Sequence, residues 1–145
     1  MTIKQALKEK NKLTKQIQST VTRIQKYNSM EEGSVRTYDP KEDMDKLTTT
    51  ISQLVSLKTQ LHLANTKVYG QIFRLSEYKG LVKYLRSIDC TEGKTNESRR
   101  YGDSSTIVKT TIIDQVEMDN LISYYESEIE KIQEELDVHN ATTQI

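Results

Sequence analysis

Residues 2–26, TIKQALKEKNKLTKQIQSTVTRIQK, contain neither proline nor glycine, and apolar residues recur in them at helical intervals. The apolar stripe consists of Ile3, Leu7, Leu13, Ile17, Val21 and Ile24, and Lys10 interrupts it. Thr2 and Gln5 have the spacing of a capping box, which marks a helix start. No glycine follows before Gly33, so we predict a helix over residues 3–29. At about 1.5 Å per residue it would be about 40 Å long, which favours an elongated fold.

Three further helices are predicted from local start signals. Asp39-Pro40-Lys41-Glu42 combines an N-cap, a proline at the first helical position and a capping-box partner, and it opens a helix over residues 40–64. That helix carries the stripe Met44, Leu47, Ile51, Leu54, Leu57 (or Lys58) and Leu61. Gly70 indicates a turn, and a shorter helix is expected over residues 76–88. Asp114 and Glu117 form another capping pair, before a helix over residues 114–138.

A β-hairpin is predicted over residues 99–112. The runs RRY and TIVKTTI flank the turn residues Gly102-Asp103-Ser104, and the second run is rich in β-branched residues. Residues 89–98 are polar and contain a glycine, so we predict a loop there.

The composition fits long amphipathic helices in an oligomer. Hydrophobic residues make up 34% of the 145 residues and charged residues 29%. Helices this long and thin cannot cover their apolar stripes within one short chain. We therefore predict a mainly α-helical homo-oligomer, a dimer or higher, with one domain spanning residues 1–145. Long antiparallel helices would carry one short β-hairpin, inserted before the C-terminal helix.

The charges balance overall but not locally. Lys+Arg and Asp+Glu both number 21, so DNA is not an expected partner. Residues 3–26 carry seven basic residues against Glu9, whereas residues 114–137 carry nine acidic residues against Lys131. We expect these two helices to lie near each other, within one chain or between chains. Binding of the basic helix to a membrane or to nucleic acid is the less favoured alternative.

The location is expected to be cytoplasmic. Cys90 is the single cysteine, the N-terminus lacks the apolar core of a signal peptide, and no stretch approaches the roughly 20 apolar residues of a membrane span. If the protein is encoded by a phage, its compartment would be the cytoplasm of the host cell.

Catalysis is not expected. His62 and His139 lie on separate helices without other ligands at metal-binding spacing, and Cys90 has no histidine nearby in the sequence to activate it. No glycine-rich phosphate loop is present. We therefore predict a protein without enzymatic activity, metal or cofactor.

Residues 66–101 combine basic and aromatic side chains. The basic residues are Lys67, Arg74, Lys79, Lys83, Arg86, Lys94, Arg99 and Arg100, and the aromatic residues are Tyr69, Phe73, Tyr78, Tyr84 and Tyr101. Arginine presents a planar fork to phosphate, and aromatic rings stack on bases, so the segment suits a small anionic nucleotide. The alternative is that Phe73 and Tyr84 belong to the core and the arginines pair with the acidic helix 114–137.

The order of these elements resembles that of the septicolysin-like family of small helical proteins. Asn140, Thr142, Thr143 and Ile145 follow the pattern of that family's closing tail, Asn65-Thr66 matches its Asn-Thr after the second helix, and Ser98-Arg99-Arg100-Tyr101 occupies its hairpin region. The cytolysin label of that family would imply membrane damage, but no apolar hairpin here could insert into a bilayer. The layout is also similar to that of the phage-encoded Thoeris anti-defence sponges.

This second resemblance implies an oligomer that binds a cyclic ADP-ribose-type immune signal and withholds it from its effector without degrading it. It implies that Phe73 stacks on the base and that Arg99 and Arg100 bind the pyrophosphate. Asn65, Arg74, Tyr101 and Thr143 would contact the ribose and the edges of the ligand, with Tyr78 among the neighbouring rings. Two other functions stay open, namely a helical adaptor that binds another protein and a nucleotide-processing enzyme.

Overall fold

The protein is mainly helical with one small antiparallel sheet, as predicted. The computed structural model describes residues 1–98, 102 and 104–145. In chain order the elements are α1 (Ile3–Asn28), α2 (Pro40–Asn65), the short 3-10 helix η1 (Thr66–Val68), α3 (Tyr69–Ser87), β1 (Gly93–Ser98), β2 (Ser104–Lys109) and α4 (Gln115–Thr142). The chain forms two compact units: unit 1 comprises Met1–Tyr69 with Asp137–Ile145, and unit 2 comprises Gly70–Leu136. Within the described ranges, no helix is both long enough and apolar enough to cross a membrane.

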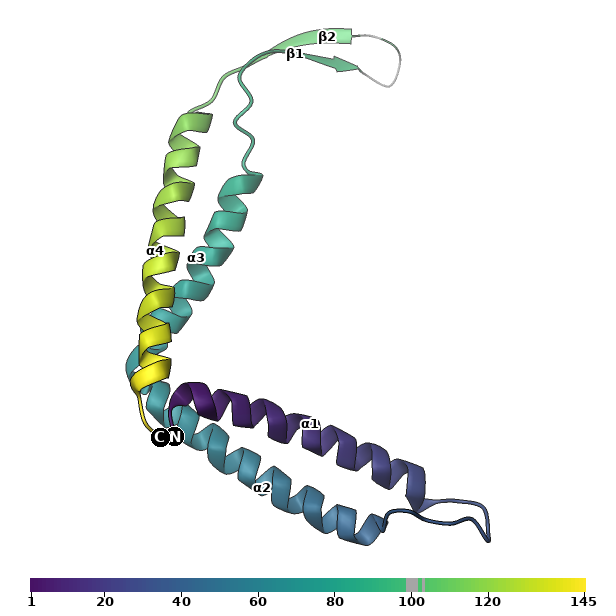
Figure 1. Ribbon diagram of the computed structural model, residues 1–145. Helices are drawn as coiled ribbons and strands as arrows, with labels where there is room; N and C mark the ends of the chain where they lie inside the picture. The colour runs from purple at the N-terminus through teal and green to yellow at the C-terminus, as the bar shows by residue number, and fades with distance from the viewer. Residues whose placement is uncertain (99–101, 103) are drawn as a thin grey trace. The chain divides into compact units, whose positions relative to one another are not determined.

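In unit 1, α1 and α2 form an antiparallel helical hairpin (Figure 1). Thr2 and Gln5 form the capping box of α1 as predicted. At the start of α2 the predicted N-cap Asp39 accepts a hydrogen bond from the backbone of Lys41, and Pro40 occupies the first turn, but Glu42 does not complete a capping box there. The buried positions are three, four or seven residues apart, which is the spacing of two helices packed as in a coiled coil. They are Ile3, Ala6, Leu13 and Thr20 in α1, and Asp43, Thr50, Leu57 and Leu61 in α2.

Polar residues occupy part of this core, and this was not predicted. Thr20 and Thr50 are 3% and 5% exposed, and each hydroxyl donates to a carbonyl of its own helix, Gln16 O and Lys46 O, at 2.8 Å. The predicted stripe residues Met44 and Ile51 are instead 48% and 44% exposed. The α2 stripe is wider than one neighbouring helix can cover, and α1 covers only the side that contains Thr50 and Leu57.

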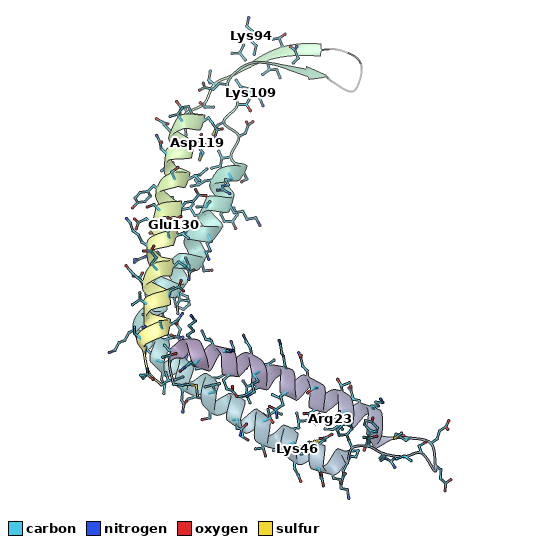
Figure 2. The ribbon with its side chains drawn as sticks, viewed as in Figure 1. Arg23, Lys46, Lys94, Lys109, Asp119 and Glu130 are labelled. Atoms are coloured by element: carbon cyan, nitrogen blue, oxygen red, sulfur yellow. The ribbon has the colours of Figure 1, made fainter. Side chains whose placement is uncertain are left out.

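An ion pair closes the end of unit 1 next to the loop between its helices. Arg23 donates from Nε and Nη2 to the two carboxylate oxygens of Asp43, at 3.0 and 2.9 Å, and this lowers the pKa of Asp43. The ring of Tyr38 lies 4.9 Å from the guanidinium. Arg36 donates to the carbonyl oxygens of Tyr27 and Asn28, which satisfies acceptors left open at the C-terminus of α1. Figure 2 shows Arg23 and Lys46 at this end of the hairpin.

The other end of unit 1 is closed by residues from both ends of the sequence. Thr2 and Gln144 form an antiparallel β-bridge, and the N–H of Ile3 donates to the carbonyl of Thr143 at 3.1 Å. Ile3 is fully buried and belongs to a core cluster against which Ile145 packs. We call this arrangement the terminal clasp; the two termini lie side by side in Figure 1.

Unit 2 contains α3, the two strands and most of α4. The predicted helix over residues 76–88 is too short, because α3 begins at Tyr69 and includes Gly70. A glycine costs about 1 kcal/mol in a helix interior and less near its start, and the half-buried Ile72 and Leu75 stabilise the first turns by packing. The helix predicted over residues 114–138 starts one residue later and continues to Thr142.

The predicted hairpin exists, but its first strand lies earlier in the chain. β1 is Gly93–Ser98, inside the stretch that we predicted as loop, and it pairs from Gly93↔Lys109 to Ser98↔Ser104. Arg99, Arg100 and Tyr101, predicted as the first strand, lie outside the described residues. Backbone pairing with β2 explains a strand in so polar a segment, because the ladder bonds do not depend on the side chains. Gly93, with φ of 91°, provides the left-handed backbone at its start.

Candidate ligand-binding site

Three tyrosines from α3 and α4 gather on one side of unit 2. The ring of Tyr78 meets that of Tyr125 edge to face, with centroids 5.1 Å apart and an interplanar angle of 73°. Tyr124 packs on Tyr125 in the same manner, at 5.2 Å and 76°. We call Tyr78, Tyr124 and Tyr125 the tyrosine cluster. Tyr124 is 58% exposed, so the cluster presents an aromatic face to solvent.

A hydrogen-bonded chain positions an arginine beside this cluster. Arg74 lies one turn before Tyr78 and therefore on the same side of α3. Its Nη1 donates to Gln71 Oε1 at 3.3 Å, and Gln71 Nε2 donates to Glu135 Oε2 on α4 at 2.7 Å. Among the described residues Arg74 makes no ion pair, so its charge is held by a neutral amide and stays available to an anion.

A second cation lies near the outer tyrosine. Lys131 donates to Glu128 Oε1 at 2.8 Å, and this contact raises the pKa of Lys131, with a smaller contribution from Tyr124. Lys131 follows Tyr124 by two turns, which places both on one side of α4. Glu128 neutralises Lys131, whereas Arg74 has no carboxylate partner among the described residues.

The opposite side of the α3–α4 pair is lined by charged residues of both signs. Arg86 forms an ion pair with Glu126, which is the pairing with the acidic helix that the sequence left open for the arginines. Two open depressions follow: one of about 340 Å³ includes Arg86, Gln115 and Asp119, and one of about 460 Å³ includes Lys79, Glu126 and Glu130. Figure 2 shows Asp119 and Glu130 along α4. Acids line both depressions, so an anion is disfavoured there.

The structure brings together only some of the residues predicted for a ligand site. Arg74 and Tyr78 share one side of α3, whereas Phe73 lies about 100° around the helix from Arg74 and is 63% exposed. Asn65 and Thr143 belong to unit 1. Thr143 takes part in the terminal clasp, and its hydroxyl lies 3.0 Å from His139 Nδ1. Arg99, Arg100 and Tyr101 are outside the described residues.

Half of the residues at this candidate site were not predicted from the sequence. Tyr124, Tyr125, Gln71 and Glu135 were not among the residues that we predicted for a ligand site. The adjacent pair Tyr124-Tyr125 was the available signal, because a heptad-like stripe needs only one ring at that point. Their juxtaposition with Tyr78 depends on the pairing of the two helices.

The described residues contain no candidate metal site. In residues 1–98, 102 and 104–145, no group of three or more His, Cys, Asp and Glu side chains is arranged to hold an ion. Cys90 is a half-buried free thiol.

Comparison with known proteins identifies no relative. No protein-family model matches the chain, and neither a curated protein nor a solved structure matches it significantly.

Proposed function

We propose that this protein is a non-catalytic binding protein that sequesters a cyclic ADP-ribose-type signalling nucleotide, as the Thoeris anti-defence sponges of phages do. The observation that carries the proposal is the exposed guanidinium of Arg74, which has no anionic partner among the described residues and lies on the same side of α3 as a ring of the tyrosine cluster. A nucleotide offers both complementary groups, a flat base and a pyrophosphate.

The proposed binding mode assigns one task to each group. The exposed face of Tyr124 stacks on the base, which is worth about 1–3 kcal/mol per base in comparable sites. The fork of Arg74 binds a phosphate oxygen pair, and Glu135, held by Gln71, accepts a hydrogen bond from a ribose hydroxyl. None of these tasks requires a bond to break, so the ligand leaves the protein unchanged.

The remaining predicted residues form a second part of the proposal. Arg99 and Arg100 add cations for the pyrophosphate, and Phe73 and Tyr101 add rings. Asn65 and Thr143 belong to unit 1, and we assign them no contact in this binding mode. Binding by several such groups would exclude water from the ligand and would therefore slow its release.

The direct test is a thermal-shift titration of the full chain with cyclic ADP-ribose and its glycocyclic isomers. A ligand at 100 times its Kd stabilises the folded state by about 2.7 kcal/mol, which corresponds to a Tm rise of roughly 8–10 °C for a chain of this size. The bound nucleotide is then released by heat and identified by mass spectrometry. An unchanged mass supports sequestration, an altered mass indicates an enzyme, and no shift with any isomer contradicts the proposal.

Matched variants locate the site. Arg74→Gln should weaken binding about 10- to 100-fold, the effect of one lost charge-assisted hydrogen bond, whereas Lys83→Gln, a change of the same charge on an exposed part of α3, should not. Tyr124→Ala should weaken binding similarly, with Tyr84→Ala as the control because Tyr84 is 69% exposed on the side of α3 away from the cluster. Equal effects of variant and control would refute the assignment.

A helical adaptor that binds another protein is the second candidate. It is favoured by the exposed rings of Phe73 and Tyr84, which are eleven residues apart and so share the outer side of α3. The double variant Arg99→Ala/Arg100→Ala separates the two candidates. It should abolish nucleotide binding if the sponge proposal is correct, and it should leave binding of a protein to the outer side of α3 intact if the adaptor is correct.

A further inference from the structure

One side of α2 exposes apolar residues that α1 does not cover. Met44, Ile51 and Val55 are 48%, 44% and 59% exposed. Their spacings of seven and four residues place them on one side of the helix. We call these three residues the apolar side of α2. Leu47 and Leu54, both half-buried, connect it to the core of unit 1.

We propose that the apolar side of α2 binds the same side of α2 in a second copy of this chain, antiparallel, about a two-fold axis near Ile51. The two α1–α2 hairpins then form a four-helix bundle. An α2 of 26 residues is about 39 Å long, so the three residues cover its middle and first half. Antiparallel pairing about Ile51 places Ile51 against its own copy, Val55 opposite Leu47 and Met44 opposite Lys58. This proposal concerns unit 1 alone and does not depend on any nucleotide.

Two charges define the orientation. Asp45 and Lys58 make no ion pair among the described residues, and both are exposed. Asp45 lies six residues before Ile51, and Lys58 lies seven residues after it. Antiparallel pairing about Ile51 therefore brings Lys58 of each copy opposite Asp45 of the other, within one residue. Parallel pairing would oppose Asp45 to Asp45 and Lys58 to Lys58, which is unfavourable.

The charge of α1 favours the same orientation. Lys4 and Lys8 are exposed near the end of unit 1 that contains the terminal clasp, and neither makes an ion pair among the described residues. Parallel copies would bring both lysine groups together. Antiparallel copies separate them by the length of the hairpin, which is longer than the Debye length of about 8 Å at physiological ionic strength.

The first experiment measures the molar mass of the full chain without ligand, by sedimentation velocity from 1 to 200 µM (about the range over which weak and tight dimers are resolved). We expect a dimer for the wild type. Ile51→Glu should shift the equilibrium to monomer, with a dimer Kd raised at least 100-fold. Leu63→Glu is the matched control, because Leu63 is 66% exposed on another side of α2 and should leave the dimer unchanged. Circular dichroism checks that each variant is folded.

A charge exchange tests the orientation without an apolar residue being changed. Asp45→Lys and Lys58→Asp should each weaken the dimer, because each opposes like charges across the axis. The double variant Asp45→Lys/Lys58→Asp should restore it. A monomeric wild type at all concentrations, a dimer unaffected by Ile51→Glu, or a double variant no better than either single variant would overturn the proposal.

Discussion

Replacing Ile3 by alanine tests whether the terminal clasp stabilises unit 1. Ile3 is fully buried in the cluster that contains Ala6, Leu57 and Leu61. The substitution removes three carbon groups, and the burial of each stabilises the folded state by about 0.8 kcal/mol. The cavity that remains adds to this, because the start of α1 and the C-terminal residues beside it are held together by the β-bridge and cannot close on it fully. We expect the free energy of unfolding to fall by about 3–4 kcal/mol.

Urea unfolding followed by circular dichroism at 222 nm measures this difference. The matched control is Ile112→Ala, which removes the same atoms from a side chain that is 99% exposed in unit 2, and it should change stability by less than about 0.5 kcal/mol. The protein concentration is held constant, since self-association would stabilise the folded state. A loss below about 1 kcal/mol for Ile3→Ala would refute the packing that we describe around the clasp.

Three further predictions concern unit 1. Arg23 lowers the pKa of Asp43 in the folded state below its unfolded value of about 3.9. As the pH falls, the unfolded state therefore binds the proton first, and the stability of the folded state decreases below about pH 5. Asp43→Asn should flatten this pH dependence, which urea midpoints measured from about pH 3 to 7 would show. The double variant Thr20→Val/Thr50→Val should be neutral or stabilising by up to about 1 kcal/mol per site, because each hydroxyl donates only to a carbonyl that the helix already uses. Thermal unfolding measures this change, and a lower Tm would contradict the prediction. Arg36→Ala removes both donors from the carbonyls of Tyr27 and Asn28, and amide hydrogen exchange should accelerate in the last turn of α1 and not in α2.

The helices of unit 1 could be predicted from the sequence because their start signals are local. Thr2 with Gln5, and Asp39 with Pro40, act within one turn of the backbone and need no tertiary contact. The buried positions were harder to predict. Met44 is apolar and Asp43 is charged, yet Asp43 is buried because Arg23 from α1 meets it, and nothing in α2 alone indicates this.

The errors in unit 2 have the same origin. The segment from Gly93 to Ser98 has no strand propensity of its own and becomes a strand only because β2 pairs with it. Gly70 resembles a turn residue until the packing of the following turns is known. In the candidate site, Arg74 and Tyr78 were identified from their chemistry, whereas Tyr125 was not, because its contact with Tyr78 spans 47 residues of sequence and depends on the pairing of two helices.

The terminal clasp also has a kinetic consequence. Joining Thr2 to Gln144 in an unstructured chain would close a loop of about 140 residues, at an entropic cost of about 4 kcal/mol beyond the constant term. The α1–α2 hairpin and the α3–α4 pair, whose helices are joined by the hydrogen bond from Gln71 to Glu135, bring together residues that are closer in sequence. Once both have formed, the loop that the clasp must still close is only about fifteen residues long. The clasp is therefore expected to form after both hairpins, so that Ile3→Ala accelerates unfolding and leaves the folding rate nearly unchanged.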